Sequence, residues 1–265
     1  MTRKMSLAAF SLIHLSPADV VRTAALAGFG NVGVRLAALP HGIDHHMLGH
    51  SRTRQETRRA LGDTGLSVLD VEAVWLTGQT SVPSLEPLFE AAAELEARYL
   101  DVLCFDPDFD RACDTFGQLC RSAQPYGLGC SVEFMGFSAV PTIESARSMV
   151  DRADSPGAGV LVDPLHLFRT GASLAEVAAT PPSALSIVQL CDAASTDPEP
   201  DLATARTEAL AGRLPPGEGV FPLDEFVRTL PHDAAVSIEV PYVEGRGELE
   251  HAARLYAGGM KLLER

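Results

Sequence analysis

Residues 129–133, GCSVE, open a region in which four apolar segments end in the same way. The other three segments are GVLVD at 159–163, LSIVQ at 185–189 and VSIE at 236–239. Each is short and apolar, and each closes on a side chain whose oxygen could bind a metal: Glu133, Asp163, Gln189 and Glu239. A strand rarely ends in a buried carboxylate or amide unless something binds that group. The pattern therefore indicates parallel strands whose ends meet in one shared site.

Similar strand–helix units extend outward from this region. We expect strands at 5–10, 31–36, 66–72, 99–105, 129–133, 159–163, 185–189 and 235–240, and helices at 17–28, 53–64, 84–97, 109–126, 142–152, 173–179, 223–230 and 247–264. Eight such units within 265 residues indicate α/β architecture in a single (β/α)8 TIM barrel over residues 1–265. An open, doubly wound sheet is the competing architecture, but the first strand–helix turn has no GxGxxG loop. Residues 191–219 read as a long polar loop.

Composition limits the classes of partner. The chain has 21 basic and 35 acidic residues and a formal net charge of −14, and we find no local basic patch. This charge repels phosphate backbones and anionic lipids, so we expect a small-molecule substrate and neither nucleic acid nor membrane. Five cysteines without CxxC spacing indicate a reduced, cytoplasmic protein. Assembly into a homo-oligomer is left open.

Three carboxylates that converge on one site repel one another unless a cation neutralises them. An oxygen-rich ligand set favours a hard divalent ion, so we expect one Mn²⁺ or Mg²⁺, with Co²⁺ or Zn²⁺ as alternatives. Taken singly, each acidic residue could equally cap the following helix, and Asp163 before Pro164 could be a turn residue. CSVE and VSIE show no obvious capping partner for Glu133 and Glu239, which favours the metal site.

Further candidates lie close to the predicted strand ends. His166 follows Asp163 by three residues and could move a proton near neutral pH, or be a helix-terminal histidine held by backbone. Arg213 could clamp a carboxylate, phosphate or enolate oxygen, or pair with Glu218. Four residues are candidates for the pocket wall: His14, Arg35, Glu72 and Trp75. Glu72 could also pair with Arg35. The loop with His41, His45, His46 and His50 is better interpreted as an exposed loop than as a metal-binding cluster, and it could form part of a lid.

The motifs SVEFMG, VLVDPLHLF, IVQLCDA and VSIEVPY resemble the xylose isomerase-like TIM barrel superfamily, over nearly the whole chain. The resemblance implies one divalent metal held by Glu133, Asp163, Gln189 and Glu239, and a substrate contact for His166. Most sugar epimerases of this group have His where this chain has Gln189. Bacterial 3-dehydroshikimate dehydratases are similar in having Gln there and an Arg before a PG(E/Q)G turn, as at Arg213. Their second substrate-holding Arg, near the end of strand three, has no counterpart between Glu72 and Leu76.

The resemblance also implies proton abstraction next to a carbonyl, with Glu133 and Glu239 as base and acid and with His166 and Arg213 steadying the developing charge. We therefore expect a metal-dependent isomerase or epimerase of a small keto-sugar or related polyhydroxy carbonyl compound. The first alternative is a metal-dependent dehydratase acting on 3-dehydroshikimate or an inosose-like substrate. An alternative of another class is a non-catalytic barrel that binds a sugar.

Overall fold

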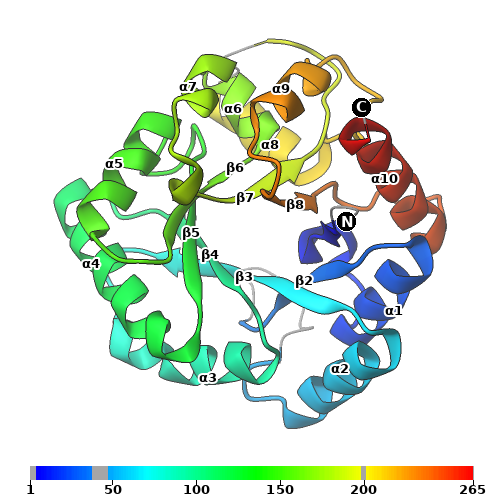
Figure 1. The fold of residues 1–265 in the computed structure, drawn as a ribbon, viewed down its shortest axis with the longest axis horizontal. Helices are drawn as coiled ribbons and strands as arrows, with labels where there is room; N and C mark the ends of the chain where they lie inside the picture. The colour runs from blue at the N-terminus through cyan, green and yellow to red at the C-terminus, as the bar shows by residue number, and fades with distance from the viewer. Residues whose placement is uncertain (1–3, 38–46, 198–200, 265) are drawn as a thin grey trace.

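Eight parallel strands close into a barrel in the computed structural model, which describes residues 4–37, 47–197 and 201–264 (Figure 1). The strands are β1 (Met5–Leu7), β2 (Asn31–Arg35), β3 (Ser67–Leu76), β4 (Tyr99–Cys104), β5 (Gly129–Glu133), β6 (Ala158–Val162), β7 (Leu185–Leu190) and β8 (Ala235–Ile238). Each strand pairs in parallel with the next, and β8 pairs with β1. The predicted (β/α)8 barrel is confirmed, and the open sheet is excluded.

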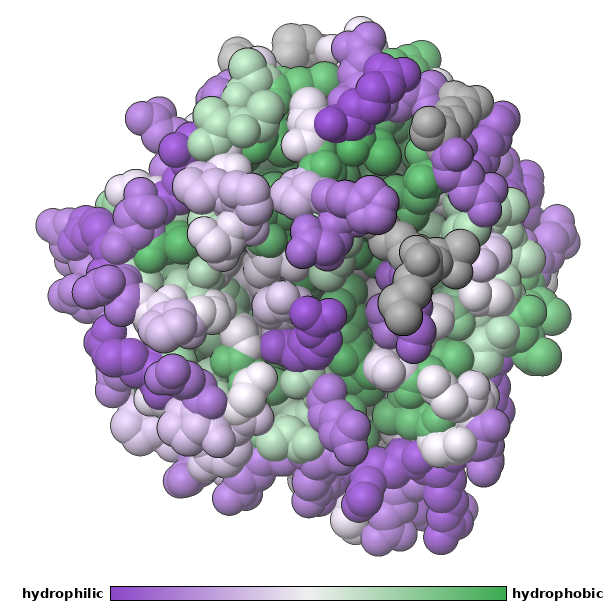
Figure 2. All heavy atoms as spheres, in the orientation of Figure 1, coloured by the Kyte–Doolittle hydropathy of each residue, from purple (hydrophilic) through white to green (hydrophobic). Residues whose placement is uncertain are grey.

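Helices form a ring outside the strands (Figure 1). They are α1 (Pro17–Ala27), α2 (Ser51–Thr64), α3 (Glu86–Glu94), α4 (Phe109–Ala123), α5 (Ile143–Ala153), α6 (Pro164–Arg169), α7 (Leu174–Ala178), α8 (Leu202–Ala211), α9 (Leu223–Thr229) and α10 (Glu248–Leu263). The face of the molecule in Figure 2 is hydrophilic around this outer ring, and the hydrophobic residues gather further in. No helix in the described part of the chain is long and apolar enough to cross a membrane.

Helix α1 shows how local sequence fixes an element. The Ser16 side chain accepts a hydrogen bond from the backbone N–H of Asp19 at 3.2 Å, and Pro17 occupies the first helical position. Both features stabilise a helix start. Gly28 ends the helix with a φ of 104°, a left-handed conformation that glycine adopts without a steric penalty. The predicted start and stop of this helix are confirmed.

The interior of the barrel is less apolar than its outer wall. In β5, Cys130 and Val132 alternate with Ser131 and Glu133, and such alternation places successive side chains on opposite faces. Parallel pairing aligns Asp101 of β4 with Ser131, so both lie on the same face. Outward residues pack against the helices in one large apolar core, while inward residues lead toward the mouth formed by the strand ends.

Several predicted boundaries were wrong. The third strand runs to Leu76 and not to Glu72, because Val74 and Trp75 continue the pairing with Val102 and Leu103 of β4. The first strand ends at Leu7, where a 3-10 turn over Ala9–Leu12 begins. The predicted polar loop at 191–219 contains α8, whose N-terminus is capped by Asp201. A short helix, α6, begins directly after Asp163.

Candidate active site

The four predicted metal ligands come from the carboxyl ends of β5 to β8. Glu133 is the last residue of β5 and Gln189 lies near the end of β7, while Asp163 and Glu239 directly follow β6 and β8. All four are buried. Three of them line a cavity of about 170 Å³ together with His166 and Arg213. The structure therefore brings the predicted strand endings to one mouth.

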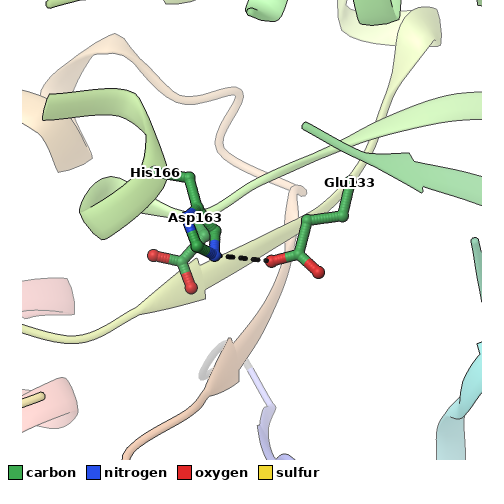
Figure 3. A group of neighbouring side chains, drawn as sticks. All are labelled: Glu133, Asp163 and His166. Atoms are coloured by element: carbon green, nitrogen blue, oxygen red, sulfur yellow. Dashed lines mark ion pairs between the residues drawn. The ribbon is translucent and has the colours of Figure 1, made fainter. Parts of the chain in front are cut away.

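Asp163 connects two elements of the site, because it directly follows β6 and caps α6. Its Oδ1 accepts a hydrogen bond of 2.7 Å from the backbone N–H of Leu165, so the capping role and the site role coexist in one residue. Ligand atoms of Glu133, Asp163 and His166 all lie within 4.8 Å of one another (Figure 3). The His166 Nε2 lies 3.5 Å from Glu133 Oε1, the contact drawn as a dashed line.

Arg213 is the cation that connects the carboxylates. Its guanidinium donates to Asp163 in a close ion pair and lies 3.0 Å from Glu239 Oε2. Its Nη2 also lies 3.4 Å from His166 Nε2. The Glu239 Oε1 in turn accepts a 3.2 Å hydrogen bond from the Gln189 amide. Since Arg254 pairs with Glu218, the alternative pairing of Arg213 with Glu218 is excluded.

Burial shifts the titration of these groups. Burial and the charge of Glu239 hold the pKa of Glu133 well above its usual range. Burial, opposed by Arg213, raises the pKa of Glu239 to about 7. Burial alone would raise the pKa of Asp163, but the charge of Arg213 and the hydrogen bonds from Arg213 and Leu165 outweigh burial and leave that pKa below its ordinary value. Burial lowers the pKa of His166 to about 4, so this imidazole is neutral at neutral pH.

Two observations test whether these residues fit a metal ion. Glu133 Oε1 and Gln189 Oε1 are buried oxygens without a hydrogen-bond partner within the described residues. Buried oxygens are normally paired with a donor or a cation. Carboxylate and amide oxygens beside one imidazole are also ligands that divalent ions accept. The residues therefore fit a single divalent ion, with His166 as an added nitrogen donor that the predicted set did not include.

A second group of charged residues lies where the end of β2 pairs with the middle of β3. Glu72 accepts hydrogen bonds from the backbone N–H groups of Ala9 at 2.6 Å and Phe10 at 2.9 Å. Arg35 lies 3.4 Å from its Oε2, as the predicted pairing of Arg35 with Glu72 requires. Burial and the charge of Asp70 raise the pKa of Glu72 to about 7. Both oxygens of Glu72 are thus engaged by the protein itself.

The four residues proposed for the pocket wall separate into two sets. Arg35, Glu72 and Trp75 line the cavity. His14 does not line the cavity. Its ring packs at a tilt against Tyr242, with centroids 4.5 Å apart, and its Nε2 lies 3.5 Å from Glu248 Oε1. Within the histidine-rich loop, His41, His45 and His46 lie outside the described residues, and His50 directly precedes α2.

Apart from Trp75, sequence reasoning missed the apolar wall of the cavity, and it missed helix α8. Trp75 stacks on Phe105 with ring centroids 5.0 Å apart, and Phe137 meets the His166 ring edge-on at 5.6 Å. α8 covers the mouth with Arg206, Ala209 and Leu210, and Arg213 follows its end. A helical spacing of three to four residues from Arg206 to Arg213 was the available signal.

The fold and site together define a class: a (β/α)8 barrel with an acidic, partly cation-neutralised cluster at the carboxyl ends of β5 to β8. The model of the xylose isomerase-like TIM barrel family matches residues 21–265, so the chain belongs to this family. The resemblance seen in the strand-end motifs is confirmed. No curated protein matches the chain by sequence.

Solved structures share the fold at low sequence identity. The IolI protein with a bound zinc atom has a TM-score of 0.79 and 15% identity over 98% of both chains. The probable 3-DHS dehydratase AsbF from Bacillus anthracis has a TM-score of 0.76 and 17% identity over 99% of both chains. D-Psicose 3-epimerase from Clostridium cellulolyticum H10 has a TM-score of 0.71 and 13% identity over 98% of this chain and 97% of its own. The chain spans only 42% of a barrel–dioxygenase fusion protein that it also matches. At these identities the likeness shows the fold alone.

The arrangement has the groups needed to move a proton next to a carbonyl. Two carboxyl groups with raised pKa values, Glu133 and Glu239, face one small cavity. A carboxyl whose pKa lies near the working pH can both accept and return a proton. Arg213 and the neutral His166 are donors placed beside them, where charge on a substrate oxygen would develop.

Proposed function

We propose that this protein is a divalent-metal-dependent isomerase or epimerase of a small keto-sugar or related polyhydroxy carbonyl compound. The observation that carries the proposal is the pairing of Glu133 and Glu239, two buried carboxyl groups with raised pKa values, across one cavity. Solved structures that share the fold include an epimerase, which supports an enzymatic role in outline.

Glu133, Asp163, Gln189 and Glu239 would hold the ion, with His166 close enough to contribute. The unpartnered oxygens of Glu133 and Gln189 support this assignment. When bound, a divalent ion supplies Lewis-acid polarisation of the substrate carbonyl, which acidifies the neighbouring C–H bond. Mn²⁺ or Mg²⁺ suits the oxygen-rich set best, with Co²⁺ or Zn²⁺ as alternatives.

The protein groups divide the proton transfer between them. In this proposal Glu239 removes the proton from the carbon next to the carbonyl, and Glu133 returns a proton to the opposite face. His166, neutral at neutral pH, donates a hydrogen bond to the substrate oxygen. The Arg213 guanidinium, held between Asp163 and Glu239, stabilises negative charge as it develops there.

A dehydratase is the second candidate, and Gln189 is the observation that favours it. The Gln189 amide donates to Glu239, a hydrogen bond that supports the charged carboxylate as a base. The Arg213–Gly219 segment, RLPPGEG, also resembles the dehydratase motif. The reaction would begin with the same proton removal and would then expel a β-hydroxyl from 3-dehydroshikimate or an inosose-like substrate.

The test is a substrate screen with added Mn²⁺ or Mg²⁺ over ketoses, inososes and 3-dehydroshikimate. An isomerase or epimerase exchanges a substrate proton with deuterated water without losing water. A dehydratase forms a product that absorbs in the ultraviolet. If the metals produce neither a thermal shift nor a bound ion, and no compound reacts, the enzyme proposal is wrong and a sugar-binding barrel without catalysis is the better account.

A further inference from the structure

Arg206 is the cation of the cavity that the proposed chemistry leaves unused. It lies on α8 and lines the cavity, with its side chain exposed. Arg35 and Arg213, the other two arginines of the cavity, pair with Glu72 and with Asp163 and Glu239. Across residues 4–37, 47–197 and 201–264, no carboxylate pairs with Arg206.

Helix α8 is held in place, so Arg206 is presented from a fixed element. Arg169 of α6 donates two hydrogen bonds, of 2.6 and 2.7 Å, to the carboxylate of Glu208. The same guanidinium donates to the backbone carbonyl groups of Asp197 and Ser195. This pair is largely buried, and bidentate arginine–carboxylate pairs fix orientation as well as distance.

One aromatic ring separates Arg206 from the centre of the site. The Arg206 guanidinium carbon lies 6.0 Å from the Phe137 ring centroid, and the His166 ring lies 5.6 Å from the same centroid. Trp75 and Phe105 stack to form another apolar wall of the cavity. A compact molecule whose carbonyl lies beside Glu133 and Glu239 can therefore lay an apolar face on these rings and extend its far end toward Arg206.

We propose that Arg206 binds a carboxylate of the substrate, so that the substrate class is a small polyhydroxy carbonyl acid. This inference rests on the proposed function and deepens it. The planar guanidinium matches a carboxylate in a bidentate geometry. A phosphate is commonly bound by backbone N–H groups at a helix N-terminus, but Asp201 already occupies the N-terminal N–H groups of α8.

Binding of shikimate and of its methyl ester tests the proposal without turnover. The two probes share one ring and differ in whether the carboxylate is free. We expect Mn²⁺-treated wild-type protein to bind shikimate at least ~10-fold more tightly than the ester by calorimetry, a difference of about 1.4 kcal/mol. Arg206→Gln should abolish this preference without changing the affinity for the ester, and Arg58→Gln, on the exposed surface of α2, should preserve it.

Four results would overturn the inference. Equal binding of both probes by the wild type, or binding of neither at millimolar concentration, removes the carboxylate subsite. Equal weakening of both probes by Arg206→Gln assigns the arginine to packing on Phe137. A preference for fructose 6-phosphate over fructose that exceeds the shikimate preference and disappears in Arg206→Gln assigns the subsite to phosphate.

The same variant separates this inference from the proposed function. If a neutral ketose turns over with a KM that Arg206→Gln does not change, the proposed function stands and the carboxylate subsite fails. If no ketose, inosose or 3-dehydroshikimate reacts but shikimate binding depends on Arg206, the subsite stands and the proposed reaction fails.

Discussion

Two carboxylate–arginine groups lie at the same mouth of the barrel, Glu72 with Arg35 and Asp163 and Glu239 with Arg213, and they differ in how their oxygens are bonded. Within β3, beside the end of β2, Glu72 accepts hydrogen bonds on both oxygens from backbone N–H groups of the turn after β1, and Arg35 adds a longer contact. At the ends of β6 and β8, Arg213 contacts Asp163 and Glu239, while oxygens of the neighbouring Glu133 and Gln189 have no hydrogen-bond partner among described residues. A carboxylate whose oxygens hold the backbone is a structural anchor. Unpartnered buried oxygens beside a paired cation are open to a ligand.

Replacing Glu239 gives the largest expected effect. Glu239→Gln keeps the shape of the side chain but removes the proton acceptor, so turnover should fall by at least ~100-fold. At about pH 5, where the wild-type Glu239 carboxyl is protonated in the fold, the melting temperature of the metal-free protein should change little. Enzyme assays and thermal unfolding on the same preparation measure both quantities. Retained turnover would show that Glu239 is not the base, and the Arg213–Asp163–Glu239 group would then be no more catalytic than the Glu72–Arg35 group.

Replacing Glu72 should have the opposite profile. Glu72→Ala leaves the buried N–H groups of Ala9 and Phe10 without acceptors, which costs about 1–3 kcal/mol for each group. Denaturant unfolding should show this loss, while Mn²⁺ affinity measured by calorimetry changes little. A stable Glu72→Ala protein that no longer binds Mn²⁺ would show that Glu72 belongs to the ion site.

Removing Arg213 tests whether its ion pairs compete with the metal. Arg213 competes with an ion for the carboxylate charge of Asp163 and Glu239, so Arg213→Gln should raise Mn²⁺ affinity about tenfold, or ~1.4 kcal/mol. Arg35→Gln removes a charge from the same mouth but frees only Glu72, and is the matched control. Equal gains in both variants would reduce the effect to general electrostatics, and weaker binding in Arg213→Gln would show that Arg213 supports the ion.

The last expected effect is on the pH dependence of stability. Burial, opposed by Arg213, raises the pKa of Glu239 from an ordinary 4.5 to about 7. A group whose pKa is raised in the folded state stabilises the fold while protonated, and that contribution is lost as the pH rises through about 7. The free energy of unfolding of the wild type, relative to Glu239→Gln, should therefore fall between about pH 5 and pH 7.5 in metal-free buffer. An unchanged difference would show that Glu239 titrates as an ordinary carboxyl group.

The fold was predictable because its signals are local. Apolar runs mark the strands, and signals such as the Ser16–Pro17 start and the Gly28 stop mark the helices of each βα unit. Once the strands are assigned, the residues at their carboxyl ends, from Glu133 to Glu239, can be predicted as site residues. Contacts between residues far apart in the sequence were harder to predict. Nothing in the sequence around Glu72 indicates that it anchors a turn 62 residues away.

Helix α8 also forms part of the mouth of the barrel, but the polar sequence of this region predicted a loop. Helix α8 is short and its apolar residues, such as Leu202 and Leu210, are exposed. It therefore lacks the buried stripe by which surface helices are recognised. The contacts of Arg213 with Asp163 and Glu239 could not be predicted, because they depend on α8, which Arg213 follows.

The closing seam between β1 and β8 has a consequence for how the chain is made. The Ala8 N–H donates to the Ile238 carbonyl at 3.0 Å, and Gly259 of α10 packs so closely that a Cβ there would lie 2.7 Å from Met5 Sδ. Of the eight barrel strands β1 is synthesised first and β8 last, so β1 cannot complete its pairing until β8 has been made. Contacts between distant parts of a chain form slowly, and until they form, an unpaired β1 edge is exposed to misassembly. Glu239 directly follows β8 and its N–H donates to the Leu190 carbonyl of β7, so the acidic mouth is completed only after the last strand of the barrel has been made.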